Sequence, residues 1–299
     1  MRIFVTGASG WIGSAVVPEL LAAGHQVVAV ARSDDAAQAV AALGAEVLRG
    51  SLEDPAGLRD GAASCEGVVH LAYDHDFSDM EKAAETDRRA IEAFGTTLIG
   101  TDGPLVIASG LAGLSPGRVA TERDVPDPAV HPRTAGAELA IALADRGVRS
   151  VSVRFAPTVH GPGDHGFVAL LVEIAKAARA SGHIEDGSNR WPAVHRLDAA
   201  SLVRLAVDGA PAGSSVHALA EEGIPTREIA EAIGAGLDVP VVSVPTDRAA
   251  EHFGWLARFF GADIVASNTI TRDLLGWQPT HPGLIEDLAE GSYFRTQGG

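Results

Sequence analysis

The chain has 299 residues, of which 46% are hydrophobic, enough to bury a sizeable core in one large α/β domain or two closely joined ones. Its formal net charge of −16 at pH 7 predicts a surface that repels phosphate backbones, so nucleic acid and anionic membranes are not expected as partners. Cys65 is the single cysteine, which excludes an intramolecular disulfide, and the apolar run at residues 3–5 is too short for a signal peptide or a membrane span. We therefore expect a cytoplasmic protein.

Short apolar runs alternate with Ala-rich helical stretches through the first half of the chain. The runs are apolar throughout, which is typical of strands buried on both faces of a parallel sheet. Strands separated by helices indicate repeated right-handed βαβ units, so the sequence predicts an α/β fold with a doubly wound parallel sheet of the Rossmann type. The predicted strands are residues 2–6, 26–31, 45–49, 67–72, 104–108 and 150–155, and the predicted helices are 14–23, 35–43, 81–94 and 133–146.

After residue 155 this alternation weakens, and Pro, Trp and His become more frequent. We place a boundary near residues 161–163. It divides the chain into a first domain over 1–160, which later segments complete, and a second over 161–299 that shares a cleft with it. Helices are predicted near 166–180, 199–207, 226–234 and 249–260, and the last is expected to bury Trp255, Phe259 and Phe260.

Three glycines, Gly7, Gly10 and Gly13, stand between the first strand and the first helix. One allows a tight turn, another lets the backbone approach a pyrophosphate, and the third lets the helix pack closely on the strand. The helix N-terminus then offers free N–H groups and a partial positive charge to the phosphates. A plain glycine turn is the alternative, but it would not require the strand, helix and further βα units around it. The sequence therefore predicts a dinucleotide site on Gly7, Ser9, Gly10, Trp11, Ile12 and Gly13.

The end of the second predicted strand selects the adenine ribose. A carboxylate there would bind the 2′-hydroxyl of NAD, but the chain has Arg32 and Ser33, which suit a 2′-phosphate. Arg32 as a solvated surface residue is the alternative, and Asp34 and Asp35 follow directly. We expect NADP as the cofactor, with NAD as the less favoured choice.

With these motifs, the chain resembles the extended and atypical short-chain dehydrogenase/reductase superfamily over almost its whole length. The resemblance implies a seven-stranded Rossmann sheet, a smaller C-terminal α/β substrate-binding domain and a cleft over the nicotinamide. It also implies a homodimer and further cofactor contacts from Leu52, Leu71, Ala72, Ser109 and Pro157. The segments that carry it are Thr6–Gly13, Val68–Ala72, Arg154–Asp164, Val194–Asp198 and Leu275–Pro279.

The sequence departs from this family at its catalytic pair, Tyr-x3-Lys. Common members use that tyrosine to give or take the substrate proton, while the lysine lowers its pKa and holds the ribose. Here Tyr73 is followed four residues on by Phe77, and Tyr293 by Gln297, so no such pair exists. The helix that should carry it begins in residues 131–138, and the family serine falls near Ser109.

Other side chains are candidates for the missing function. Tyr73 follows the fourth strand at the nicotinamide side and could donate a proton, although an edge packing role is an equal alternative. Arg133 could hold the cofactor or the substrate, or it could simply be a solvated side chain at the start of a helix. His160 could act as an acid or base near neutral pH, although a lone histidine is more often structural. Together with Ser109, these make up the expected catalytic set.

Polar and aromatic residues of the second domain are candidates for the substrate pocket, with an ordered turn and a Trp core anchor as the alternative. They are His165, Phe167, Asn189, Trp191 and His195. Asp74, His75 and Asp76 are consecutive, so we expect a polar loop. No metal site is expected because no His-x3-His or Cys-x2-Cys spacing occurs.

These observations favour an NADPH-dependent reductase of a small organic molecule. A ketone acceptor becomes an alkoxide that needs a proton donor, whereas an iminium ion is already protonated, so imine reduction suits a site without the tyrosine. Two alternatives remain. One is a non-catalytic NADP-binding regulator, and the other is a sugar-nucleotide epimerase/dehydratase or hydroxysteroid dehydrogenase type of enzyme.

Overall fold

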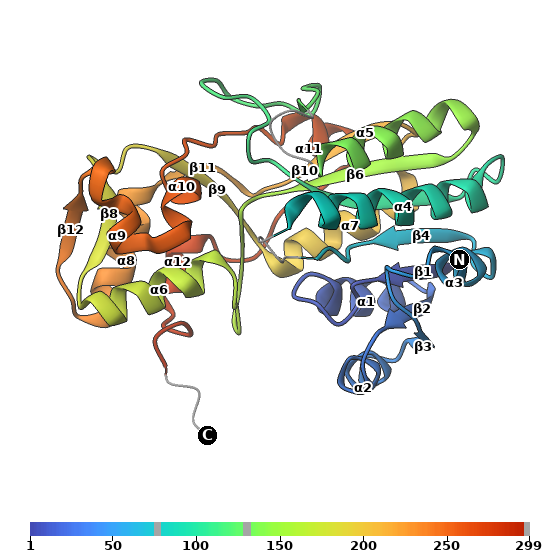
Figure 1. Cartoon of the computed structure of the whole chain (residues 1–299), viewed down its shortest axis with the longest axis horizontal. Coiled ribbons are helices and arrows are strands. Elements are labelled where there is room, and N and C mark those ends of the chain that lie inside the picture. Colours follow the sequence, from blue (N-terminus) through green and yellow to red (C-terminus); the bar gives the residue numbers. More distant parts are fainter. Residues whose placement is uncertain (75–78, 128–132, 296–299) are drawn as a thin grey trace.

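The computed structural model describes residues 1–74, 79–127 and 133–295. The chain forms a larger lobe built on a seven-stranded sheet and a smaller lobe beside it (Figure 1). The strand order is β10-β6-β5-β4-β1-β2-β3 and every neighbouring pair is parallel, which confirms the predicted doubly wound Rossmann sheet. The strands are β1 (Arg2–Thr6), β2 (Gln26–Ala31), β3 (Glu46–Arg49), β4 (Gly67–His70), β5 (Pro104–Gly110), β6 (Arg149–Phe155) and β10 (Ser214–Ala218).

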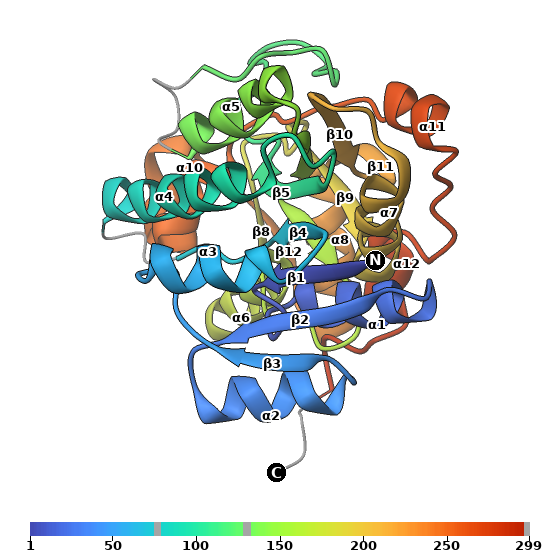
Figure 2. The same ribbon diagram turned by 90° about the vertical axis from the view of Figure 1, so that its right-hand side faces the viewer.

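Helices cover both faces of this sheet (Figure 2). Strand β1 shows why its sequence is apolar throughout: Phe4 belongs to one buried cluster, Ile3 and Val5 belong to another, and all three are fully buried. The Ile3 and Val5 face carries α1 (Gly13–Ala22), α2 (Asp34–Ala42) and α7 (Arg196–Gly209). The Phe4 face carries α3 (Pro55–Ala63), α4 (Met80–Leu98) and α5 (Thr134–Ala142), followed by the 3-10 turn η1 (Leu143–Arg146).

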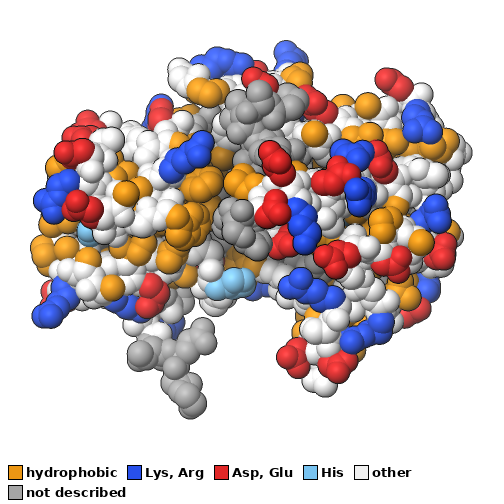
Figure 3. Space-filling model, viewed as in Figure 1, with side chains coloured by type: hydrophobic (Ala, Val, Ile, Leu, Met, Phe, Trp, Pro, Cys, Tyr) orange, Lys and Arg blue, Asp and Glu red, His pale blue; other side chains and the backbone are white. Residues whose placement is uncertain are grey.

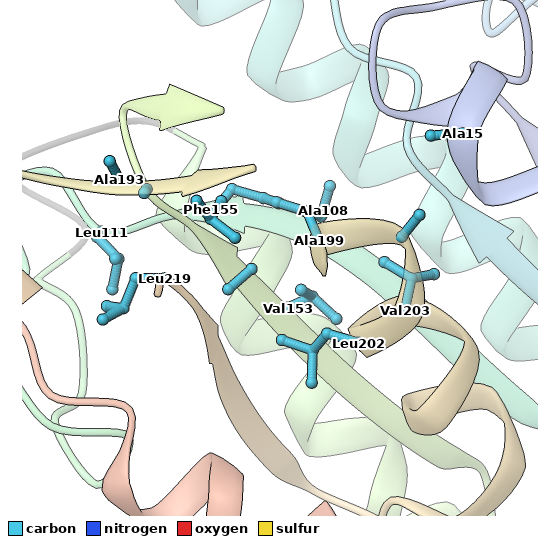
Figure 4. Close-up of a cluster of buried hydrophobic side chains, with 14 of the residues drawn as sticks. Ala15, Ala108, Leu111, Val153, Phe155, Ala193, Ala199, Leu202, Val203 and Leu219 are labelled. Atoms are coloured by element: carbon cyan, nitrogen blue, oxygen red, sulfur yellow. The ribbon is translucent and has the colours of Figure 1, made fainter. Parts of the chain in front are cut away.

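Two elements from the second half of the chain complete the sheet lobe. Strand β10 extends the sheet beside β6, and α7 packs over it. Leu202 and Val203 of α7 share a buried cluster with Val153 and Phe155 of β6 (Figure 4). Burying each such side chain contributes roughly 1.5–3 kcal/mol, so this seam is a substantial part of the core.

The smaller lobe holds two short sheets and most of the remaining helices. The sheets have the orders β11-β9-β7 and β12-β8. No helix within the described ranges combines the length and apolarity needed to cross a membrane. The elements are β7 (Thr158–His160), β8 (Ser181–Ile184), β9 (Arg190–His195), β11 (Glu221–Pro225), β12 (Val241–Val244), α6 (Phe167–Ala178), α8 (Thr226–Leu237), η2 (Thr246–Arg248) and α12 (Leu284–Ala289), while α11 (Thr269–Leu275) lies against α7 and β10.

The predicted helix over 249–260 is instead three short pieces, α9 (Ala249–Phe253), η3 (Gly254–Leu256) and α10 (Ala257–Phe260). Gly254 has φ of 58°, a left-handed conformation that breaks a right-handed helix. The break turns Trp255 outward, where it is 52% exposed, while Phe260 is buried as expected. The prediction that Trp255 belongs to the core is therefore wrong.

Candidate cofactor and active site

A cavity of about 940 Å³ opens at the carboxyl ends of the central strands. Its walls are the loops after β1, β2, β3 and β4, the β7 segment, the start of α6 and Trp255, so both lobes contribute. On the smaller lobe, hydrophobic side chains gather beside the junction with the larger lobe (Figure 3). Ligands of open parallel sheets bind at this edge, and the volume is in the range of cofactor and substrate sites. The lining includes the predicted cofactor residues Gly7, Ser9, Gly10, Trp11, Ile12, Gly13, Arg32, Leu52, Leu71, Ala72 and Pro157.

The glycine turn is as tight as the sequence predicts. Gly7 has φ of 72°, and a Cβ there would lie 2.6 Å from the backbone nitrogen of Ala72. A Cβ on Gly13 would lie 2.0 Å from the carbonyl oxygen of Gly7. Helix α1 then begins at Gly13 without a side-chain cap on its first turn. The turn thus presents bare backbone amides to the cavity, the arrangement that binds a pyrophosphate.

Arg32 and Ser33 take different roles at the far end of the cavity. Arg32 lines the cavity and is exposed, whereas Ser33 lies outside the lining, where its hydroxyl caps α2 by accepting from the backbone nitrogen of Ala36 at 3.2 Å. Arg49, at the end of β3, donates to the Ser33 carbonyl and forms an ion pair with Asp34 at 2.9 Å. One of the two acidic side chains that follow Ser33 is therefore already engaged by a second arginine.

A buried polar chain that the sequence analysis missed runs beneath the glycine turn. The Thr6 hydroxyl lies 2.7 Å from His70 Nδ1, and His70 Nε2 lies 3.1 Å from Asp87 Oδ1. Thr6 Oγ1 also accepts from the backbone nitrogen of Ala72 at 3.3 Å. These bonds are mutually compatible when the Thr6 hydroxyl donates to Nδ1 and Nε2 donates to Asp87. These hydrogen bonds join the end of β1 to the end of β4, and therefore hold the glycine turn in place relative to the segment that carries Tyr73.

Tyr73 lines the cavity directly after β4, and Arg133 lies behind it. The guanidinium carbon of Arg133 is 4.0 Å from the centroid of the Tyr73 ring, and its Nη2 donates to the carbonyl oxygen of Ala108 at 2.9 Å. Burial raises the pKa of Tyr73, while the positive charge of Arg133 opposes that rise. Two separately predicted catalytic residues therefore lie in contact, with a cation against the ring face where the family has a lysine one helical turn away.

Two other predicted catalytic residues do not reach the cavity lining. Ser109, at the end of β5, accepts a hydrogen bond from the Ser152 hydroxyl at 3.1 Å. His160 is fully buried, and its Nδ1 lies 2.9 Å from Asp287 Oδ2 in α12. Its ring meets the His195 ring edge-on at 5.5 Å. His160 therefore joins β7 to α12 and has no access to a molecule in the cavity, contrary to the expected position.

The predicted substrate residues divide in the same way. His165 and Phe167 line the cavity, but Asn189, Trp191 and His195 do not. The Asn189 amide donates to the carbonyl oxygen of Phe260 at 2.7 Å, so it fixes a turn. Trp191 is 1% exposed and lies in the core, and His195 Nδ1 accepts from the backbone nitrogen of Leu197 at the start of α7. All three side chains follow the structural alternative: Trp191 and His195 belong to β9, which is buried along most of its length, and Asn189 directly precedes it.

Asp164 is a lining residue that sequence reasoning passed over. Its Oδ1 accepts from the backbone nitrogen of Gly166 at 2.6 Å, and its Oδ2 accepts from the Tyr293 hydroxyl at 2.9 Å. The Tyr293 hydroxyl also accepts from the backbone nitrogen of Gly161 at 3.3 Å. Burial raises the pKa of Asp164 and that of Tyr293. The partners are 129 residues apart, so no local pattern predicts their contact.

Within residues 1–74, 79–127 and 133–295, no three His, Cys, Asp or Glu side chains are grouped so that they could hold a metal ion. Asp74 lines the cavity. His75 and Asp76 of the predicted polar loop lie outside the described residues, as do His131 and Pro132 before α5.

Comparison with known proteins agrees with this geometry. Residues 7–99 match a family model described as NAD(P)H-binding. An uncharacterized protein of Schizosaccharomyces pombe is 49% identical over 98% of this chain and 100% of its own length. A Stigmatella aurantiaca enzyme named 4-hydroxy-2-methyl-3-oxo-4-farnesyl-3,4-dihydroquinoline-1-oxide ketoreductase is 28% identical, over 85% of this chain and 80% of its own.

Among solved structures, MoeE5 in complex with UDP-glucuronic acid and NAD superposes with a TM-score of 0.76 at 23% identity and covers 98% of both chains. That likeness concerns the fold, while the sequence relatives include named reductases. The sheet order, the glycine turn and these relatives lead to one conclusion: the chain belongs to the extended short-chain dehydrogenase/reductase superfamily of NAD(P)-dependent enzymes.

Proposed function

We propose that the protein is an NADPH-dependent reductase that delivers hydride to a small organic acceptor, an imine or a ketone. The observation that carries the proposal is that the glycine turn and the aromatic side chains of Phe167 and Trp255 line the same cavity. When bound on the turn, a reduced nicotinamide would supply the hydride. The chain's own residues would hold the dinucleotide, orient the acceptor and keep water from it.

The preference for NADP rests on charge at the far end of the cavity. Arg32 lines the site, and the ion pair between Arg49 and Asp34 offsets part of the negative charge that follows β2. Arginine is well suited to phosphate because it combines charge with several N–H donors. Calorimetry with NADPH and NADH tests this point, and tighter binding of NADH would contradict it.

The preference for an imine rests on the proton donor. Tyr73 faces the cavity, but burial raises the pKa of its phenol, and the stacked Arg133 lacks the position of the family lysine. Such a phenol is less suited to exchange protons with an alkoxide near neutral pH than one whose pKa is lowered. An iminium acceptor avoids this requirement, because it carries its proton before the hydride arrives.

The test is the loss of NADPH absorbance when the protein is mixed with cyclic imines and, in parallel, with ketones of the same carbon skeleton. We expect turnover with imines to exceed that with the matched ketones. Tight NADPH binding without turnover of any compound in a broad panel would instead support a second candidate, a non-catalytic NADP-binding regulator. The observation that favours this candidate is the missing Tyr-x3-Lys pair. A partner protein whose binding follows the NADP/NADPH ratio would then identify it.

We also propose that the protein acts in the cytoplasm and as a homodimer. Cys65 is a free thiol, which suits a reducing compartment. The homodimer follows from the family resemblance, and light scattering across a concentration series tests it.

A further inference from the structure

The cavity lining also combines aromatic rings with the carboxyl group of Asp164. Trp11, His165, Phe167 and Trp255 line the cavity together with Asp164. The Trp11 and His165 ring centroids are 5.4 Å apart, and those of Phe167 and Trp255 are 6.1 Å apart. A carboxyl group and several aromatic rings in one cavity form a chemical combination that neither the glycine turn nor hydride transfer itself requires.

Asp164 is held firmly in this position. The backbone nitrogen of Gly166 donates to one carboxyl oxygen and the Tyr293 hydroxyl to the other. A carboxylate offers about four lone-pair sites, so each oxygen can accept a further hydrogen bond from a ligand. Tyr293 is itself fixed, since its hydroxyl accepts from the backbone nitrogen of Gly161. The carboxyl group is therefore oriented before any ligand arrives.

The charged neighbours of Asp164 do not neutralise it. In the described part of the chain, no Lys or Arg makes an ion pair with this carboxyl group. Arg196 interacts with it electrostatically, but its guanidinium lies over the Trp11 ring at 4.0 Å and donates to the Ser14 hydroxyl at 2.9 Å. The Tyr293 hydroxyl, His165 and His160 also favour its charged form. Burial dominates these effects and raises the pKa of Asp164.

We propose that Asp164, oriented by Tyr293 and lining the same cavity as these rings, binds a positively charged nitrogen of the substrate. This inference rests on the proposed reductase and names its substrate class as iminium ions with an apolar body, together with the amines they yield. Aromatic faces attract cations, and a partly dehydrated carboxylate pairs with them strongly. The net charge of −16 adds a field that draws cations to the molecule.

The assignment is consistent with a balanced reduction. Addition of hydride to the iminium carbon forms the new C–H bond, and the C=N π pair moves to nitrogen as a lone pair. NADPH is oxidised to NADP⁺, and the neutral amine then takes a proton from water. Asp164 transfers no proton in this sequence. Asp164 holds the substrate nitrogen while the nitrogen loses its positive charge, and it binds the nitrogen again after the product amine is protonated.

The experiment compares two ligands of similar shape, 2-phenylethylammonium and 2-phenylethanol, binding to the protein with NADP⁺ present. Fluorescence of Trp11 and Trp255, together with calorimetry, reports binding without any turnover. We expect the ammonium ion to bind at least about tenfold more tightly than the alcohol, the effect of about 1.4 kcal/mol. The preference should disappear in Asp164→Asn, while NADPH affinity stays unchanged.

Asp186→Asn is the matched control, because Asp186 also accepts from the backbone nitrogen two residues on but lies outside the cavity lining. The wild-type pH profile provides a check that needs no variant. As the pH is lowered, protonation of Asp164 should abolish the ammonium preference. Because the pKa of Asp164 is raised, this loss should occur at a pH above the ordinary titration range of aspartate, while binding of the alcohol should not change with pH.

Tyr293→Phe distinguishes a role of Tyr293 in orienting the Asp164 carboxyl group from a purely structural role. The Tyr293 hydroxyl bond lowers the pKa of Asp164, so removing it should move the loss of ammonium binding to higher pH. A wild-type protein that binds both ligands equally, or an Asp164→Asn protein that keeps the preference, overturns the inference. Absence of turnover with every acceptor, combined with an intact ammonium preference, would instead count against the proposed reductase alone.

Discussion

At the scale of single residues, the turn after β1 leaves no room for added side-chain atoms at Gly7 or Gly13. A side chain on Gly13 would collide with the Gly7 carbonyl oxygen, which is backbone and cannot turn aside. The turn and the first helix would have to separate, and the amides that face the pyrophosphate would move with them. The predicted dinucleotide site therefore depends on the absence of one methyl group.

Gly13→Ala should abolish measurable NADPH binding, or at least weaken it about a hundredfold, because the amide cradle is displaced. Titration of tryptophan fluorescence with NADPH measures the effect. Gly110→Ala is the matched control, since a Cβ there meets nothing within 4 Å and should leave affinity unchanged. Normal NADPH binding by Gly13→Ala would mean that the dinucleotide lies elsewhere.

The choice between the two dinucleotides is also a matter of individual charges. Arg49→Gln should weaken NADPH binding roughly threefold to fivefold and leave NADH binding unchanged, because it frees the Asp34 carboxylate that follows β2. In an Asp34→Asn background, the same substitution should have little effect. Calorimetry then gives the NADPH affinities of the wild type, the two single variants and the double variant. An equal loss of affinity on replacing Arg49 in both backgrounds would show that Arg49 contacts the phosphate directly.

Tyr73 separates the two proposed acceptors. If the substrate is an iminium ion, Tyr73→Phe should reduce kcat by less than about threefold, since no proton is needed from the phenol. A ketone reductase that uses this hydroxyl should instead lose about 100-fold to 10,000-fold in kcat. Steady-state kinetics with matched imine and ketone pairs, together with NADPH affinity measured separately, decide between them.

At the scale of elements, a buried histidine joins α11 to the edge strand β10. His217 Nδ1 lies 2.8 Å from the carbonyl oxygen of Ser267, and its Nε2 lies 3.4 Å from Arg154 Nη1. Arg154 can only donate, so Nε2 must accept and the ring is neutral. Burial lowers the pKa of His217 to about 4.

This histidine should make stability depend on pH in a defined window. Between about pH 6.5 and pH 4 the unfolded chain binds the proton and the folded chain does not, so the free energy of unfolding falls as pH falls. The loss should approach about 3 kcal/mol by pH 4. Urea unfolding at several pH values measures it. His217→Gln should flatten this dependence, whereas His165→Gln, on an exposed side chain, should retain it.

At the scale of the whole molecule, the sheet lobe is completed by segments from the second half of the chain. Without β10 and α7, the edge of β6 and the apolar side chains beneath α7 would face water. A fragment of residues 1–160 should therefore show no cooperative thermal transition, while the full chain shows one. A fragment that unfolds cooperatively and binds NADPH would contradict this.

The sequence predicts the sheet lobe well and the smaller lobe less well. Continuous apolar strands and the glycine turn are local patterns, so β1 to β6 and the tight turn after β1 could be inferred from them. The role of Asp164 depends on Tyr293, and that of His160 on Asp287, and both pairs join distant parts of the chain. Trp255 shows the same limit, since a single left-handed glycine decides which way it faces.

The way the chain passes between the lobes has a consequence for protein engineering. It leaves the sheet after β6, returns with α7 and β10, leaves again for β11, and comes back once more with α11. Exchanging the smaller lobe for that of a relative would therefore require several grafts whose junctions must all match. New specificity is more readily sought by recombining loops at the cavity mouth than by shuffling whole modules.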